Sequence, residues 1–334
     1  MKSWSDSDSP DKHVGMKRWG DSDSTDKYVG MKSAVRGHFP RFITEKGQKW
    51  LFNPILKKRY KNLPEERVRL KWVDYLLDQA AWKKSRITFE APVELKSDSG
   101  RGRTDLLLYN NAMKPHILIE CKADSVALNR ASAEQASRYN STIAAPFIIL
   151  TNGLIDYYFE IKSGTPNPID NPFKTNEVNK PRDLIYWAHR GFCAAQNHPK
   201  ASEWLSLAMN IFWDDSIEGE VRYLDFKESP LPFPIQHYYR IFSMESEKRL
   251  AVTFLGDVYA GSHLVAVLNS KGTNTGILAI NLNMLAESGS GAVTIISEGQ
   301  SRVMNSDFKL NSILFDQRGD FIKNLHKQLR KFFD

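Results

Sequence analysis

Two short apolar segments that carry charged residues constrain most strongly what this chain can fold into. They are Arg103–Tyr109 and Ile117–Lys122, and polar segments or segments containing glycine or proline bound both of them. This pattern predicts two neighbouring strands. Because residues two apart on a strand point to the same face, Glu120 and Lys122 share a face, and Asp105 lies on the strand before them. We therefore predict that these three side chains form one cluster.

The cluster has two interpretations. A carboxylate and an ammonium group on one strand can form a structural salt bridge. Alternatively, two carboxylates at the ends of adjacent strands can hold Mg²⁺, which prefers oxygen ligands, with Mn²⁺ as a substitute. The cation would polarise a phosphate and lower the pKa of a bound water, while Lys122 would orient that water or neutralise developing charge. The second interpretation predicts a metal-dependent phosphodiesterase site, with Cys121 as a buried packing residue on the opposite face.

A helix is predicted over residues 64–81, with a proline in its first turn and apolar residues at helical spacing. Projecting the apolar rows backward places Glu66 toward the sheet and Glu65, with Arg69, on the side that faces water. Glu66 is therefore a further candidate acid. Glu90, on a predicted strand, is either a rival for that role or a structural residue.

A second helix is predicted over residues 129–144, where Gln135 and Tyr139 are four apart and share a face. Apolar runs predict the remaining strands, at residues 86–95, 147–153 and 157–161. The order of one helix, three strands, one helix and two strands predicts an α/β sandwich with a mixed sheet.

These segments resemble the PD-(D/E)xK nuclease superfamily, with Asp105 as the acid and Glu120-Cys121-Lys122 as the (D/E)xK element. They resemble in particular the N-terminal nuclease domain of type I restriction enzyme R subunits and their standalone relatives, over about residues 50–162. The segments that carry the resemblance are Leu63–Arg69, Arg103–Tyr109, Ile119–Ala123, Gln135–Asn140 and Leu150–Gly153. A D…ExK pattern alone is weak because chance matches are common, whereas the ordered set is much more specific.

The resemblance implies a restriction-endonuclease-like α/β/α core with a mixed sheet and a set of site residues. Asp105 and Glu120 would be metal ligands, joined by the backbone carbonyl of Cys121. Lys122 would be the catalytic lysine, and Glu66 would be an additional acid near the metal. The cofactor implied is Mg²⁺, with Mn²⁺ as its substitute.

The resemblance also implies that Gln135 and Tyr139 support the site or contact the backbone of a nucleic acid. The implied function is a Mg²⁺-dependent endonuclease that acts on DNA, in prokaryotic defence or DNA processing, with RNA as an alternative substrate. No G-x-x-x-x-G-K-[S/T] loop is present, because Lys271-Gly272 lacks its spacing, so we expect no use of ATP. The alternative function is a nuclease-fold module that binds or senses nucleic acid with little or no turnover.

The net charge of +7 and pI of about 9.1 permit a polyanionic partner but do not by themselves establish one. Basic residues near the predicted site could form a rim that contacts phosphates, and the alternative is a solvated surface. These candidate nucleic-acid-binding residues are Arg101, Arg103, Lys83, Lys84 and the run Lys57–Lys61.

Residues 1–15 and 16–30 form a tandem repeat in which eleven of fifteen positions match. The repeat is too polar to bury a core, so we expect a disordered polar leader over residues 1–42. A docking peptide that uses Trp4 and Trp19 is the alternative.

After the leader we expect a nuclease domain at residues 43–162, a linker at 163–183 and a C-terminal α+β domain rich in antiparallel strands at 184–334. In the last domain, helices are predicted at residues 184–196, 201–212 and 318–333, and strands at 249–255, 263–268, 276–282, 292–297 and 309–315. Its role is open among specificity, homodimer formation and docking of a protein partner.

The chain has two cysteines, which give no disulfide framework, and its N-terminus lacks the apolar core of a secretory signal. Its apolar runs are far shorter than the roughly 18 residues that span a bilayer, so we expect no membrane contact. We therefore expect a cytoplasmic protein.

Overall fold

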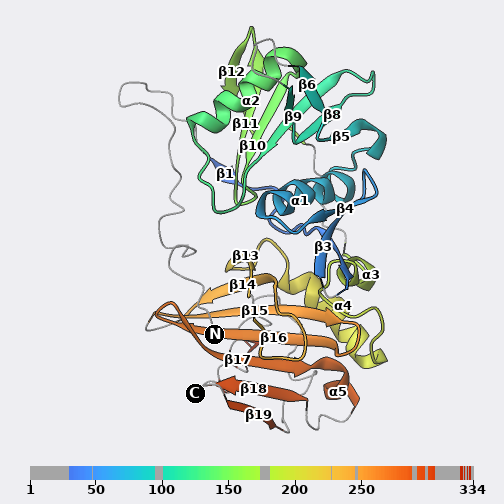
Figure 1. Ribbon diagram of the computed structural model, residues 1–334, viewed down its shortest axis with the longest axis vertical. Coiled ribbons are helices and arrows are strands. Elements are labelled where there is room, and N and C mark those ends of the chain that lie inside the picture. Colours follow the sequence, from blue (N-terminus) through green and yellow to red (C-terminus); the bar gives the residue numbers. More distant parts are fainter. Residues whose placement is uncertain are drawn as a thin grey trace. The chain divides into compact units, whose positions relative to one another are not determined.

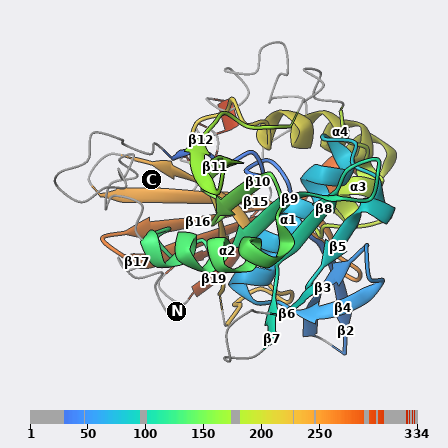
Figure 2. The ribbon, with the colours of Figure 1, turned by 90° about the horizontal axis from the view of Figure 1, so that it is seen from above.

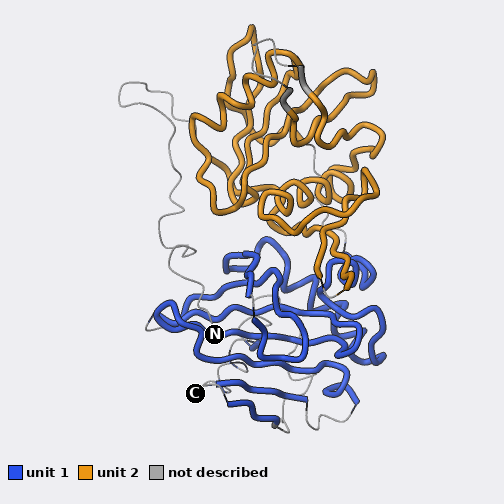
Figure 3. The backbone as a smooth tube through the Cα atoms, in the orientation of Figure 1, with its two compact units in different colours: residues 1–10, 180–334 blue, residues 11–179 orange. Residues whose placement is uncertain are grey.

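The structure is a computed structural model that describes residues 30–46, 48–94, 101–173, 181–226, 228–244, 247–287, 292–297 and 300–304, and residues 324, 325, 327, 329 and 331. The chain divides between residues 179 and 180 into two compact units, which we call the N-terminal unit and the C-terminal unit (Figure 3).

The described residues of the N-terminal unit are built on a seven-stranded mixed sheet (Figure 1). The strand order is β1-β11-β10-β9-β8-β5, and β12 pairs with β11. Strands β9 and β10 run parallel, while the other neighbours run antiparallel. The strands are β1 (Met31–Lys32), β5 (Ile87–Phe89), β8 (Leu106–Tyr109), β9 (Pro115–Cys121), β10 (Phe147–Thr151), β11 (Ile155–Lys162) and β12 (Thr165–Pro168).

Two helices, α1 (Pro64–Asp78) and α2 (Arg130–Ile143), cover opposite faces of this sheet. The buried side chains of α1, such as Trp72, join a core with Ile119 on one face. The buried Ala136 of α2 joins a core with Leu150 on the other face. The two cores lie on opposite faces because side chains alternate along a strand. This is the α/β/α core with a mixed sheet that the sequence predicts.

Three parts of the N-terminal unit differ from the expectations. Residues 30–42, expected within the polar leader, include β1 and the start of β2, and Val35 and Phe39 among them are completely buried. β12 lies within the segment expected to be a linker. The strand predicted at residues 86–95 is interrupted at Glu90, whose φ of 54° breaks it into two strands. The rest of the leader, residues 1–29, lies outside the described residues.

Two small sheets complete the described residues of this unit. A three-stranded antiparallel sheet has the order β2-β3-β4, and a two-stranded sheet pairs β6 with β7. Figure 2 shows β2, β3 and β4 as a separate small sheet beside the larger one. Their strands are β2 (Arg41–Glu45), β3 (Gln48–Asn53), β4 (Lys58–Lys61), β6 (Pro92–Glu94) and β7 (Arg101–Arg103).

The C-terminal unit is dominated by a seven-stranded antiparallel sheet among its described residues, with the strands in chain order. The strands are β13 (Glu220–Leu224), β14 (His237–Ser243), β15 (Lys248–Asp257), β16 (Gly261–Ser270), β17 (Thr273–Asn281), β18 (Val293–Ser297) and β19 (Gln300–Met304). Its helices are α3 (Leu184–Ala188), α4 (Pro199–Phe212) and α5 (Leu282–Glu287). The α+β class rich in antiparallel strands is confirmed.

Strands β15 to β18 lie where four of the five strands were predicted, whereas the fifth prediction, residues 309–315, lies outside the described residues. Strands β13, β14 and β19 were not predicted. β14 carries Arg240, which is 2% exposed because its guanidinium donates to the carbonyls of Ile217 at 2.6 Å and Asp214 at 3.0 Å. A buried arginine interrupts the apolar pattern by which a strand is recognised. Helix α3 is shorter than predicted, and most of the helix predicted at residues 318–333 lies outside the described residues.

None of the helices in the described part of the chain is long and apolar enough to cross a membrane.

The C-terminal unit is expected to lose stability in mild acid through His263, which lies on β16 and is 6% exposed. Burial lowers the pKa of His263 to about 4 from its ordinary 6.5, and the Gly261 carbonyl opposes this shift. The unfolded chain therefore binds the proton first as pH falls below 6.5. Stabilisation by the neutral imidazole is complete above that pH and decreases by about 2.5 kcal/mol by about pH 4.5.

Urea unfolding of the full chain and of His263→Gln at about pH 7.5 and about pH 4.5 measures this effect. Between about pH 7.5 and about pH 4.5, the wild type should lose about 2.5 kcal/mol more unfolding free energy than His263→Gln does. A difference that is equal at both pH values would contradict the assignment.

Candidate active site

The register of two neighbouring strands brings Asp105 and Glu120 together. Leu106 pairs with Ile119 across β8 and β9, so the residues one step further along, Asp105 and Glu120, lie opposite each other. Both are buried, at 7% and 2% exposure. Asp105 Oδ2 accepts a hydrogen bond of 2.6 Å from the backbone N–H of Cys121. The two predicted metal ligands therefore share one buried edge of the sheet.

Lys122 connects this edge to helix α2. Its backbone N–H donates to the carbonyl of Thr151 on β10 at 2.8 Å. Its Nζ donates to Glu120 Oε1 at 2.9 Å and to Gln135 Oε1 at 3.0 Å. Gln135 in turn donates through Nε2 to the Tyr139 hydroxyl at 3.3 Å. The structure thus joins four of the five predicted catalytic residues in one hydrogen-bonded chain, and Asp105 lies beside Glu120.

Helix α2 is held in place by caps at both ends. Asn129 accepts from the Ser132 N–H at 3.1 Å, and Ala144 ends the helix in the left-handed conformation with a φ of 56°. The Asn140 side chain bonds both the N–H and the carbonyl of Ala145, each at 2.9 Å. These contacts determine where α2 begins and ends, and Gln135 and Tyr139 lie between the two caps.

Arg69 lies at the centre of the acidic part of the site, which the sequence did not predict. Its Nε lies 2.9 Å from Asp105 Oδ1, and its Nη1 lies 2.8 Å from Glu66 Oε1 and 3.2 Å from Glu90 Oε1. Its Nη2 lies 3.0 Å from Glu65 Oε1. The expectation that Arg69 faces water was wrong, because its residue exposure is 8%. Four carboxylates surround it, and these contacts replace water around the guanidinium.

Of the two acids at the start of α1, Glu66 is the more buried, with a side chain 13% exposed against 43% for Glu65. Its predicted orientation toward the sheet is therefore correct, and its role as a ligand stays a prediction. Glu90 accepts from the Tyr60 hydroxyl at 3.2 Å, and its backbone N–H donates to the Asp105 carbonyl at 3.1 Å. Glu90 thus belongs to the same acidic group as Glu66.

The carboxyl groups of this site share an electrostatic property. Burial raises the pKa of Glu120 to about 7; the Asp105 carboxylate reinforces this shift and Lys122 opposes it. Burial also raises the pKa of Glu66 to about 7, and the pKa of Asp105 above its ordinary value, with Arg69 opposing both shifts. Five carboxyl groups contact two cations here, Arg69 and Lys122, and a further cation would stabilise their ionised forms. Cys121 is fully buried, and burial raises the pKa of its thiol, as a packing residue requires.

The carboxylate oxygens of this site are the type of ligand that a hard divalent cation prefers. Glu120 Oε2 and Glu66 Oε2 are buried and have no hydrogen-bond partner among the described residues. Such an oxygen is costly to leave unpaired, and a cation would satisfy it. In the described part of the chain, no group of three or more His, Cys, Asp and Glu side chains has the geometry of a metal site. The predicted set does not need a third side chain, because it uses two carboxylates and one backbone carbonyl.

The predicted basic rim is only partly near this edge. Lys83 and Lys84 are exposed but precede the end of β5 that pairs with Leu108, away from Asp105. Their role in binding nucleic acid stays a prediction. Arg103 is exposed on β7, two residues before Asp105. The side chain of Arg101 lies outside the described residues.

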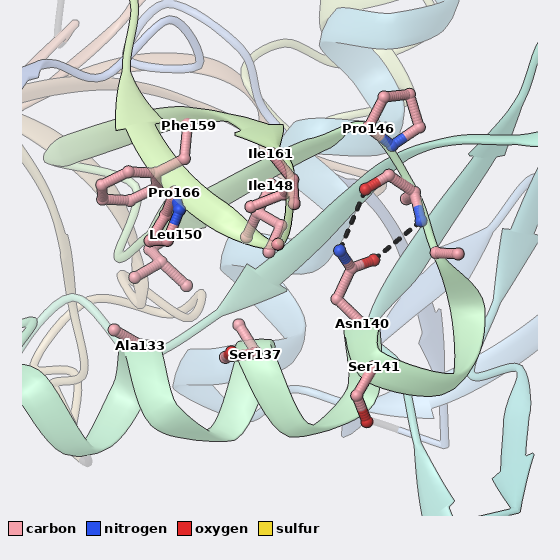
Figure 4. Close-up of a pocket in the computed structure, with 14 residues that line it drawn as sticks. Ala133, Ser137, Asn140, Ser141, Pro146, Ile148, Leu150, Phe159, Ile161 and Pro166 are labelled. Atoms are coloured by element: carbon pink, nitrogen blue, oxygen red, sulfur yellow. Dashed lines mark hydrogen bonds between the residues drawn. The ribbon is translucent and has the colours of Figure 1, made fainter.

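A separate hollow of about 570 Å³ lies between α2 and the strands β10, β11 and β12 (Figure 4). Its walls are mainly apolar, from residues such as Ala133, Ile148 and Phe159, with Asn140 at one end. None of the predicted catalytic side chains lines it. This hollow and the candidate active site are therefore distinct places on the sheet.

A mixed sheet between two helices, with an acid on one strand opposite a Glu-x-Lys element on the next, is the arrangement of the PD-(D/E)xK nuclease class. Residues 64–171 match the family model described as the type I restriction enzyme R protein N terminus (HSDR_N). The match runs from the first turn of α1 to just beyond β12 and includes every residue of the site discussed above except Tyr60. The resemblance recognised in the sequence is confirmed for this part of the chain. No curated protein shows a significant match to the chain.

Proposed function

We propose that the N-terminal unit is a metal-dependent endonuclease that hydrolyses phosphodiester bonds of DNA. The observation that carries this proposal is the buried Glu120 carboxylate, which pairs one oxygen with Lys122 and leaves the other unpaired beside Asp105. A purely structural salt bridge would gain nothing from this unpaired oxygen. The family match supports a nuclease-like role with DNA as its substrate.

The roles of the chain's own groups follow from their contacts. Asp105, Glu120 and the Cys121 carbonyl would hold the cation. When bound there, Mg²⁺, or Mn²⁺ in its place, would supply Lewis-acid polarisation of the phosphate and a water of lowered pKa. Asp105 is positioned for this by the Cys121 N–H.

Lys122 would act on the reacting groups directly. Its Nζ is fixed by Glu120 and Gln135, and its side chain is 19% exposed, so the ammonium group is held firmly but stays accessible. It would orient the attacking water and neutralise the charge that develops as the phosphorus–oxygen bond breaks. Gln135 and Tyr139 would act as positioning residues for Lys122.

A nuclease-fold module that binds or senses nucleic acid with little turnover is the second candidate. One specific observation favours it, because Arg69 Nε lies 2.9 Å from Asp105 Oδ1 and so uses one oxygen of a predicted ligand. For the first candidate, the nuclease, we also propose a role in prokaryotic defence or DNA processing and activity without ATP. Both proposals go beyond what the family match says.

Cleavage by the purified full chain tests the proposal on plasmid, linear duplex, single-stranded DNA and RNA, each with Mg²⁺, with Mn²⁺ and with chelator. We expect metal-dependent cleavage of DNA, and a loss of about 10²- to 10³-fold in Lys122→Ala. Metal-dependent cleavage at the wild-type rate in this variant would refute the site assignment. Tight binding with no cleavage under any metal would favour the second candidate.

A further inference from the structure

The three-stranded sheet formed by β2, β3 and β4 is rich in basic residues that have no role in the candidate active site. We call it the meander sheet; it spans residues 41–61. This segment holds seven lysines and arginines but only one acid, Glu45. It precedes the matched family region and is therefore a feature of this chain beyond that match. Its charge suits a polyanion.

The two faces of the meander sheet differ in character. Phe42 pairs with Leu51, and Leu51 with Tyr60, so these three share the face that packs against the core of the unit. Residues at the alternate positions share the other face, which we call the outer face. The outer face includes Arg41, Ile43, Trp50, Phe52, Arg59 and Lys61.

The outer face combines aromatic rings with cations. The guanidinium of Arg59 lies over the Trp50 ring, 5.0 Å from its centroid, and that of Arg41 lies over the Phe52 ring at 5.6 Å. Glu45 pairs with Arg59, whose side chain is still 53% exposed. Aromatic rings on a sheet stack with bases, and arginines beside them contact the phosphates. Bases can stack on such rings only where they are unpaired, so the chemistry favours a single strand.

The core-facing side of the meander sheet leads to the candidate active site. The Tyr60 hydroxyl donates to Glu90 Oε2 at 3.2 Å, and the Tyr60 ring packs edge-on against Phe89 at 5.4 Å. Glu90 Oε1 lies 3.2 Å from Arg69, which contacts Asp105. Three side-chain contacts therefore join the sheet to a predicted metal ligand.

We propose that the outer face of the meander sheet binds single-stranded DNA. The proposal rests on the proposed nuclease function for its biological meaning, but the binding itself does not require cleavage. Trp50 and Phe52 would stack with unpaired bases, and Arg41, Arg59 and Lys61 would contact the phosphates.

Fluorescence anisotropy of a labelled single-stranded oligonucleotide, and of the matching duplex, tests the proposal with the full chain in chelator, where no cleavage occurs. Trp50→Ala should weaken single-strand binding about tenfold or more, with a much smaller effect on the duplex. Arg59→Ala should reduce the salt dependence of binding by about one phosphate contact. Trp50→Phe keeps an aromatic ring and should retain most of the affinity.

Two exposed residues outside the meander sheet provide matched controls. Lys162→Ala removes a cation that is 67% exposed on β11, and Tyr259→Ala removes an aromatic residue that is 98% exposed. Both should bind the single strand like the wild type. Circular dichroism and thermal unfolding show whether each variant is folded, and Phe52→Ala with Arg59→Ala carries the test if Trp50→Ala is not.

The outcomes separate this proposal from the proposed function. Unchanged single-strand affinity in folded Trp50→Ala and Arg59→Ala would overturn the proposal, even if the wild type cleaves DNA with Mg²⁺. Equal weakening of single-strand and duplex binding by Trp50→Ala would also overturn it, since it would indicate that the ring does not stack with unpaired bases. Selective loss of single-strand binding in a chain that never cleaves would support the surface and refute the nuclease function.

Discussion

Replacing Glu120 by glutamine is expected to abolish DNA cleavage while leaving the fold intact. Glutamine keeps the shape of the side chain and an oxygen that can accept the hydrogen bond from Lys122 Nζ, now at 2.9 Å. It removes the negative charge that would hold the cation. Loss of the cation's several kcal/mol of transition-state stabilisation corresponds to a decrease of at least about 10³-fold in cleavage rate.

The stability of the fold should change little in Glu120→Gln, because the carboxylate is 2% exposed and has an unpaired buried oxygen. We expect a change in the free energy of unfolding below about 1 kcal/mol. Cleavage rates measure activity, isothermal titration with Mn²⁺ measures cation binding, and urea unfolding measures stability. Glu134→Gln makes the same chemical change at a residue on α2 that is 60% exposed, and should affect none of them. Cleavage by Glu120→Gln at the wild-type rate would establish the salt-bridge interpretation instead.

The central part of this site could be predicted from the sequence because it depends on local periodicity. The two-residue spacing of Glu120 and Lys122 fixes their common face, and the four-residue spacing of Gln135 and Tyr139 does the same on a helix. Strand β9 is apolar enough to be recognised on its own. The sequence order then places Asp105 on the neighbouring strand. These shared faces follow from the spacing alone, whereas the hydrogen bond from Lys122 to Gln135 joins a strand to a helix and was not predicted.

Other features could not be predicted because they depend on contacts between distant residues. The segment around Ala34 resembles a polar leader, yet its backbone N–H donates at 2.8 Å to Asp156, which lies 122 residues further along the chain and is fully buried. Arg69 is buried for a similar reason, since Glu90 and Asp105 come from other elements. A charged residue looks exposed in a helical projection until its partners are known.

Replacing Arg69 by leucine is expected to destabilise the N-terminal unit strongly. The side chain of Arg69 is 9% exposed and contacts Glu65, Glu66, Glu90 and Asp105 within 3.2 Å. Leucine leaves these four carboxylates without their cation. Two of them, those of Asp105 and Glu66, are mostly buried. Removing one partner of a buried ion pair costs about 3–5 kcal/mol, because the remaining charge stays buried and uncompensated.

A divalent cation should restore part of this loss. Without the guanidinium, both oxygens of Glu66 and one of Asp105 become available as hard ligands, so Arg69→Leu should bind Mn²⁺ more tightly than the wild type. A ligand that binds only the folded chain stabilises it by an amount that grows with its affinity. Urea unfolding with Mg²⁺ and with chelator, together with Mn²⁺ titration, measures both effects.

Two controls give this experiment its meaning. Arg69→Lys keeps a charge and should lose less stability, although it cannot reach all four acids. Arg130→Leu removes an arginine that is 79% exposed and pairs with Glu134 on α2, so it should cost less than about 1 kcal/mol. If Arg69→Leu unfolds like the wild type, or gains nothing from Mg²⁺, the acidic group does not act as a cation site. If Mg²⁺ stabilises Arg69→Leu more than it stabilises the wild type, the Arg69 guanidinium occupies carboxylate oxygens that a metal ion would otherwise bind.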